Sequence, residues 1–151
     1  MSKAVTLLLG LVFISFGCGK TASDGNGDAA SAGASSQGRP DRAVVYMMHR
    51  TIRCAACKQV ETMTDELLRT EFANELKDGR VEWKQVDFQE QEKLAKRYGV
   101  TGSTLVVVRF QDAKEIAHQR LDDVWGVYSD PGQFAGYVGG AIRAALPKEK
   151  A

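Results

Sequence analysis

Two cysteines three positions apart, Cys54 and Cys57, lie directly between an apolar run and a helical pattern. The run, residues 43–48, is short and continuous, as in a strand buried on both faces of a sheet. After the cysteines, apolar residues recur at helical spacing as far as Asp78-Gly79, which predicts one long helix. A C-x-x-C pair at a strand-to-helix junction therefore points to an α/β unit with both thiols at the amino end of a helix.

The rest of the chain continues the alternation of strand and helix patterns. The sequence predicts, in order, a strand at 81–87, a helix at 89–98, strands at 104–110 and 115–120, and a helix from Asp130-Pro131 to Pro147. A crossover helix between two strands implies parallel neighbours, and a turn-linked last pair implies an antiparallel edge. We therefore predict an α/β fold over residues 43–147, β-α-β-α-β-β-α, with a mixed four-stranded sheet, helices on both faces and a short tail at 148–151.

Composition and charge exclude several classes of function. With 44% apolar and 26% charged residues, the chain has the composition of a globular protein. Its net charge is +1 and its charges alternate in sign, so it lacks the basic stripe of a nucleic-acid-binding protein. Two histidines and three cysteines are too few for an array of zinc sites or a disulfide-dense scaffold.

The N-terminus predicts export. Lys3 is followed by an almost unbroken apolar run at 4–16, which is too short to span a bilayer and fits the core of a signal peptide at 1–17. The end of the run resembles a bacterial lipobox, which implies that Cys18 becomes the acylated first residue, although Ser15 stands where that pattern prefers Leu. Ordinary secretion with a free Cys18 is the alternative. Gly19 does not resemble an inner-membrane retention signal, so we expect a lipid anchor at the periplasmic face of a bacterial membrane, the outer membrane being favoured.

Residues 18–42 predict a flexible tether. Between Gly19 and Asp41, 14 of 23 residues are Gly, Ala or Ser, a composition that cannot bury enough apolar surface to order itself. The typical reach of such a segment is about 25 Å. Because the mature chain is close to neutral, we expect lipid, not charge, to attach it to the membrane.

The folded region resembles the thioredoxin-like superfamily, on the C-x-x-C motif beside a βαβ pattern. It is more narrowly similar to short bacterial thioredoxin-like proteins named as nitroreductase subunits near arsenical-resistance genes. The residues that carry this resemblance are His49-Arg50, Arg53-Cys54-Ala55-Ala56-Cys57, Glu61, Leu121 to Tyr128, Phe134 and Tyr137. The resemblance implies thiol–disulfide exchange with exported proteins and no cofactor.

The chain also departs from the thioredoxin pattern. Thioredoxins carry Trp before the first cysteine and Gly-Pro between the two, where this chain has Arg53 and Ala55-Ala56. Their cis-proline before the third strand aligns substrate, and here Ser103 and Thr104 stand at about that place. Their buried upstream acid has no counterpart in residues 44–48. These departures imply a narrow range of partners.

The position of the cysteine pair predicts different roles for the two thiols. Cys54 would lie at the helix amino terminus, where free N–H groups and the helix dipole stabilise a thiolate and lower its pKa below about 8.5. Arg53 would add a cation beside it. Cys57 would keep its proton until it resolves a mixed disulfide, and Glu61, one turn further, either accepts that proton or belongs to the solvated helix face.

Two other functions of the cysteine pair stay open. The pair is either a structural disulfide in a redox-inert lipoprotein, or it binds copper, since two thiolates suffice for Cu(I). In the copper alternative Cys54 and Cys57 are joined by His49, with Met47 and Met48 nearby as soft ligands or as core residues. Two further residues have open roles: His118 is expected on a solvent-facing edge strand, and Trp125 either packs in the core or lines a partner groove.

Overall fold

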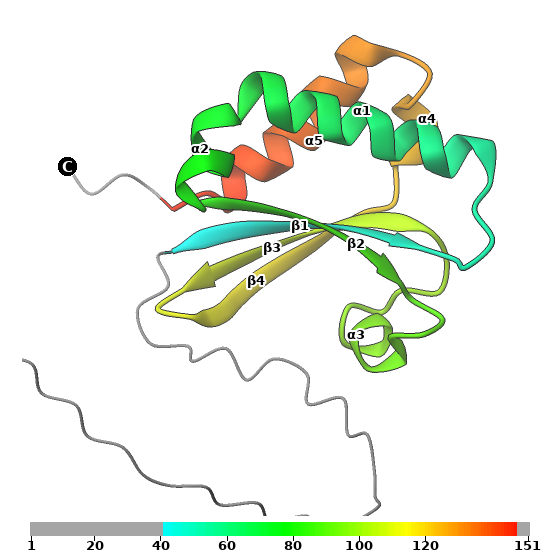
Figure 1. Ribbon diagram of the computed structural model, residues 1–151, viewed down its shortest axis with the longest axis horizontal. Coiled ribbons are helices and arrows are strands. Elements are labelled where there is room, and N and C mark those ends of the chain that lie inside the picture. The colour runs from blue at the N-terminus through cyan, green and yellow to red at the C-terminus, as the bar shows by residue number, and fades with distance from the viewer. Residues whose placement is uncertain (1–40, 148–151) are drawn as a thin grey trace, which may run out of the picture. The chain divides into compact units, whose positions relative to one another are not determined.

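The computed structural model describes residues 41–147, which form one mixed sheet flanked by helices (Figure 1). The elements are β1 (Arg42–His49), α1 (Ala55–Glu71), α2 (Ala73–Asp78), β2 (Val81–Asp87), α3 (Glu92–Arg97), β3 (Thr104–Gln111), β4 (Lys114–Leu121), α4 (Val124–Val127) and α5 (Pro131–Ala145). The strand order is β2-β1-β3-β4. β1 pairs with β2 in parallel and with β3 antiparallel, and β4 pairs antiparallel with β3. This is the predicted thioredoxin-like arrangement, and the prediction of the fold class is confirmed.

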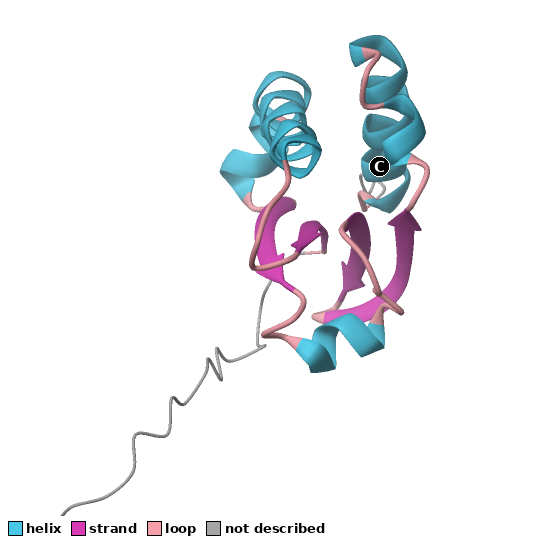
Figure 2. Cartoon of the chain, turned by 90° about the vertical axis from the view of Figure 1, so that its right-hand side faces the viewer, coloured by secondary structure: helices cyan, strands magenta, loops and turns pink. Residues whose placement is uncertain are grey.

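The helices cover both faces of the sheet. α1 and α5 lie on one face and α3 lies on the other (Figures 1 and 2). The side chains of β1 alternate between two apolar clusters: Val45 and Met47 belong to the larger one under α1 and α5, whereas Tyr46 and Met48 belong to the one under α3. A strand with buried residues on both faces has no polar face, which explains the continuous apolar run in the sequence.

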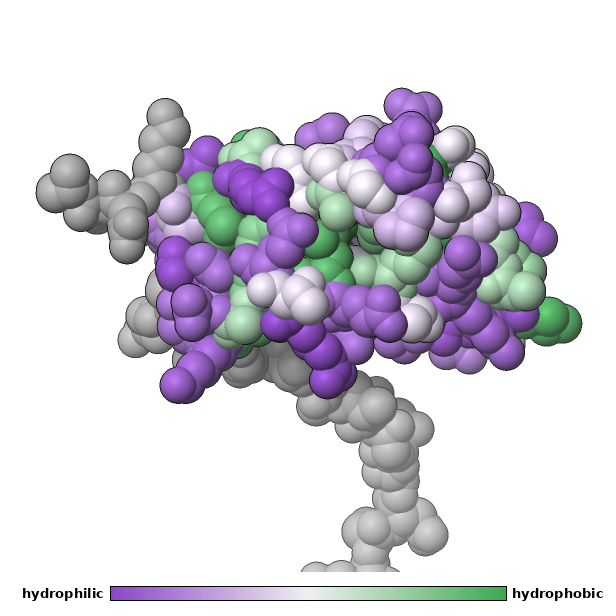
Figure 3. Space-filling model, turned by 90° about the horizontal axis from the view of Figure 1, so that it is seen from above, coloured by the Kyte–Doolittle hydropathy of each residue, from purple (hydrophilic) through white to green (hydrophobic). Residues whose placement is uncertain are grey.

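The outer surface of the α1–α5 layer contains both hydrophilic and hydrophobic residues (Figure 3). Figure 3 looks onto this layer and shows hydrophobic residues exposed among the hydrophilic side chains that cover much of it. Several hydrophobic residues of the two helices are only partly buried against the larger cluster: Met63, Ala135, Tyr137 and Ala141. The helical periodicity in the sequence thus reflects burial on one side of each helix.

Local signals place the helix ends and the hairpin. The Asp130 carboxylate accepts hydrogen bonds from the backbone N–H groups of Gly132 at 2.9 Å and Gln133 at 3.0 Å, so the expected start of the last helix is confirmed. The expected turn between β3 and β4 is also confirmed. Asp112 and Ala113 have φ values of 48° and 63°, the left-handed backbone of a tight hairpin.

One element prediction was wrong and one element was missed. The long helix after the cysteines is two helices, because Phe72 leaves helical geometry (φ −126°, ψ 26°) and buries its ring in the core. The short helix α4 was not predicted, since its sequence, Val-Trp-Gly-Val, is too short to show periodicity. In addition, Arg42, assigned to the tether, is the first residue of β1: its guanidinium pairs with Glu82 at 2.8 Å and stacks on Phe110.

The signal peptide at 1–17, Cys18, the tether up to residue 40 and the tail at 148–151 lie outside the described residues. Within residues 41–147, no helix has the length and apolar character needed to cross a membrane.

The packing predicts that Phe134 carries a large share of the stability. Phe134 is 2% exposed, so we expect Phe134→Ala to lower the free energy of unfolding by about 3–5 kcal/mol, through lost burial and a cavity. Ile52→Ala is the control, because Ile52 is 89% exposed and its loss should cost less than about 0.5 kcal/mol. Urea denaturation measures both. A Phe134→Ala variant as stable as the control would contradict the assigned core.

Candidate active site

Three strand ends meet at one edge of the sheet and place the loop that leads to the cysteines. The strand register sets His49 opposite Asp87 and Met48 opposite Thr104, so β1 and β2 end where β3 begins. The loop after β1 is bound to the end of β2. The Thr51 hydroxyl donates to the Asp87 carboxylate at 2.6 Å, and the Thr51 backbone N–H donates to the Gln89 side chain at 3.2 Å.

Cys54 and Cys57 lie on the first turn of α1. Cys54 is the N-cap residue, and its Sγ accepts a hydrogen bond from the Cys57 backbone N–H at 3.3 Å. The two Sγ atoms are 2.7 Å apart and both cysteines are free thiols. Cys54 is exposed, whereas Cys57 is 7% exposed and belongs to the larger apolar cluster. The geometry therefore gives one sulfur access to a partner and shields the other.

The surroundings of Cys54 favour its thiolate. Its pKa is lowered, first by the hydrogen bond from the Cys57 side chain and then by the one from the Cys57 backbone N–H. Partial desolvation opposes this effect. Hydrogen bonds to the charged form lower an acid's pKa, so the predicted helix-terminus effect acts here through particular donors.

Arg53 and Glu61 form an ion pair beside the cysteines. Their side chains are 22% and 19% exposed. From the sequence, Arg53 was expected to act as a cation beside Cys54, and Glu61 either to accept the Cys57 proton or to belong to the solvated helix face. The structure instead brings the two together, so the Glu61 carboxylate offsets part of the field of the Arg53 guanidinium.

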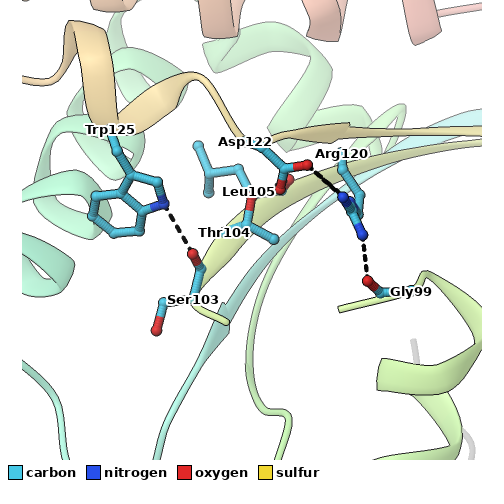
Figure 4. A network of polar contacts seen from close by, with 7 residues as sticks. All are labelled: Gly99, Ser103, Thr104, Leu105, Arg120, Asp122 and Trp125. Carbon is cyan, nitrogen blue, oxygen red and sulfur yellow. Dashed lines mark hydrogen bonds and ion pairs between the residues drawn. The ribbon is translucent and has the colours of Figure 1, made fainter. Parts of the chain in front are cut away.

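Ser103 directly precedes β3 and Thr104 is the first residue of β3, at the same edge of the sheet. Thr104 is 3% exposed and pairs with Met48. The Ser103 carbonyl accepts a hydrogen bond from the Trp125 indole N–H at 3.0 Å (Figure 4). Trp125 also packs against the larger apolar cluster, so its core role is confirmed.

The candidate copper ligands are not brought together as a set. Met47 and Met48 are fully buried in the two cores, so they act as packing residues. The Nδ1 atom of His49 lies within hydrogen-bond distance, 3.0 Å, of the Arg50 carbonyl oxygen. Within residues 41–147, no group of three or more His, Cys, Asp or Glu side chains is arranged to hold a metal. His118 is exposed on the edge strand β4, as predicted.

Three features of the site have no clear signal in the sequence. The Thr51–Asp87 hydrogen bond and the Trp125–Ser103 hydrogen bond join residues 36 and 22 positions apart, and no local pattern marks such pairs. Ile52, two residues before Cys54, is 89% exposed. Its only sequence signal is an apolar residue in an otherwise polar loop.

No protein-family model matches the chain, and a comparison with curated proteins finds no match. Among solved structures, the chain is similar to thioredoxin from Fasciola hepatica, with 25% identity, a TM-score of 0.38 and coverage of 53% of this chain and 68% of that one. It is also similar to a mutant thioredoxin from Halobacterium salinarum, with 18% identity, a TM-score of 0.45 and coverage of 73% and 80%. A third is the germline-specific thioredoxin Deadhead from Drosophila melanogaster, with 19% identity, a TM-score of 0.45 and coverage of 68% and 83%.

The strand order and the cysteine pair together define the class of protein. The chain has a thioredoxin-like fold that presents a C-x-x-C pair at the amino end of its first helix. Two adjacent thiols with unequal exposure form an arrangement suited to thiol–disulfide redox chemistry.

The geometry predicts how alkylation of Cys54 depends on pH. Because the thiolate is the nucleophile, the rate should rise with pH to a plateau whose midpoint lies below about 8.5. Cys57→Ala removes the side-chain donor that lowers the pKa most, so it should move the midpoint upward. Arg53→Ala should move it less, because Glu61 offsets that charge. Iodoacetamide labelling followed by mass spectrometry measures all three profiles, and equal midpoints for Cys57→Ala and the parent would contradict the assignment.

Proposed function

We propose that this protein is an exported thiol–disulfide oxidoreductase in which Cys54 attacks and Cys57 resolves. One observation carries the proposal. The exposed Cys54 sulfur, whose pKa is lowered, lies 2.7 Å from the buried sulfur of Cys57. A structural disulfide needs no such inequality, and a loop of this length adds little stability through chain entropy.

The exchange proceeds in two steps that conserve atoms and electrons. The Cys54 thiolate attacks one sulfur of a partner disulfide; that S–S bond breaks, a mixed disulfide forms, and the partner's other sulfur leaves as a thiolate. Cys57 then loses its proton to solvent and its thiolate attacks the Cys54 sulfur, which releases the partner's second thiolate. Two electrons pass to the partner, and Cys54 and Cys57 become a disulfide. The same steps in reverse oxidise a partner dithiol.

Arg53 and Glu61 have a supporting role in this proposal. Arg53 directly precedes Cys54, and Glu61 lies on α1 one turn beyond Cys57. Their ion pair joins the loop to the helix and so keeps the capping cysteine in place. The exchange itself needs no cofactor.

The two-step mechanism predicts unequal effects of replacing the two cysteines. Cys57→Ser should accumulate a mixed disulfide between Cys54 and a partner, since the resolving thiol is gone. Cys54→Ser should abolish exchange. Non-reducing electrophoresis after incubation with insulin, whose two chains are joined by disulfides, followed by mass spectrometry, identifies the trapped sulfur.

Circular dichroism of both variants checks that they are folded. Slow and equal alkylation of both cysteines in the parent, with no trapped adduct on Cys57→Ser, would contradict the catalytic role. Tight Cu(I) binding by both thiols, combined with absent exchange, would favour the copper-binding alternative.

We further propose that the chain is exported, cleaved before Cys18, acylated there and tethered by the residues from Cys18 up to the start of β1, with exported proteins as its partners. The support is the apolar run, the small residue before Cys18 and the Gly/Ala/Ser-rich segment. In a bacterial expression host, the mature chain should begin at a lipid-modified Cys18 and fractionate with membranes. Cys18→Ser should leave the chain unacylated and release it from the membrane fraction. Mass spectrometry of the mature N-terminus decides, and an unmodified chain that begins elsewhere would exclude the anchor.

A further inference from the structure

The loop between α3 and β3, residues 99–103, lies at the same edge of the sheet as the cysteine pair. It contains two glycines and forms neither helix nor strand, and Gly99 has a φ of 63°. It runs directly into Thr104, which pairs with Met48 near the end of β1. The loop therefore leads into β3, and β3 is the neighbour of β1, the strand that precedes Cys54 in the chain.

Two side chains from outside the loop bind its two ends (Figure 4). The Trp125 indole N–H donates to the Ser103 carbonyl at 3.0 Å, and the Arg120 guanidinium donates to the Gly99 carbonyl. Asp122 in turn orients Arg120, accepting from Nε at 3.0 Å and from Nη2 at 2.6 Å. Arg120 lies at the end of β4, Asp122 in the turn that follows and Trp125 in α4, so this segment fixes a loop more than 20 residues earlier in the chain.

Trp125 also connects this loop to the larger apolar cluster. Cys57, Leu105 and Val124 belong to one apolar cluster, and the Trp125 ring packs against that cluster. Trp125 thus packs on the core that contains Cys57, while its indole N–H binds the residue before β3. The hydrogen bond therefore fixes Ser103 to that core.

We propose that Trp125 is a positioning residue for polypeptide partners, with Arg120 in support. By fixing Ser103, Trp125 makes residues 101–103 a rigid surface at the end of the sheet where the loop to Cys54 also begins, and the chain around a partner's disulfide lies against this surface. This inference rests on the proposed thiol–disulfide exchange. A small disulfide needs only the Cys54 sulfur, whereas a polypeptide disulfide must also fit the adjacent surface. If residues 101–103 are misplaced, exchange with a polypeptide disulfide should therefore slow, whereas exchange with a small disulfide should not.

Trp125→Phe is the critical variant, because it keeps an aromatic ring in the core and removes only the N–H donor. Exchange rates are measured with two probes, oxidised glutathione and insulin. In this variant we expect the exchange rate with oxidised glutathione to stay within about twofold of the parent rate. We expect kcat/KM for insulin to fall about tenfold, through a higher KM and not a lower kcat. The pH midpoint of Cys54 alkylation should not change.

Trp83→Phe is the matched control. Trp83 is the chain's other tryptophan and packs against the same cluster, and within residues 41–147 its indole donates no hydrogen bond. It should leave the ratio of the two rates unchanged. If Trp125→Phe does not fold, Arg120→Gln tests the other end of the loop from an exposed edge strand, with the same selective loss expected.

The outcomes separate this inference from the proposed function. A parent protein that exchanges with neither probe would overturn the proposed function. A parent that exchanges with both, combined with a Trp125→Phe variant that slows both probes equally or neither, would overturn the positioning role alone.

Discussion

The hydrogen bond from the Cys57 backbone N–H to the Cys54 sulfur joins the architecture of this protein to its chemistry. A helix begins with backbone N–H groups that have no partner within the helix, and an N-cap side chain normally supplies an oxygen for one of them. Here a sulfur takes that place at 3.3 Å. After the hydrogen bond from the Cys57 side chain, the bond that caps α1 is the next largest cause of the lowered pKa of the capping thiol. Reactivity at Cys54 therefore depends on the helix beginning at this residue.

The rest of the structure holds that helix start in position. β1 is central in the sheet and packs into apolar clusters on both faces, so its end at His49 is a fixed point. From there the loop is secured to β2 through Thr51 and Asp87, and to α1 through Arg53 and Glu61. A loop that is anchored at both sides loses little additional freedom when a partner binds, which favours a well-defined attack geometry.

The sequence predicted the order of the elements better than their interruptions. Strands 43–48, 81–87 and 104–110 were found because each has a period or a run of apolar residues that only burial explains. The break at Phe72 was missed because its ring continues the apolar stripe of α1, so periodicity gave no sign of a changed backbone. At the site, Cys54 and Cys57 were placed correctly by their spacing. The pairing of Arg53 with Glu61 and of Trp125 with Ser103 was not foreseen, since it depends on side-chain directions and on distant segments.

The sequence by itself determined that two thiols meet on the first turn of a helix after a buried strand, because local patterns encode both the strand and the helix start. It also determined the near-neutral charge and the composition of the segment before the fold. Only the tertiary structure decided which sulfur is exposed, which donors lower its pKa and what stands beside it. Cys57 is buried in an apolar cluster whose members come from several elements, among them Leu105 of β3, Val124 of α4 and Phe134 of α5. Contacts of this kind follow from packing across long sequence separations, and no local pattern specifies them.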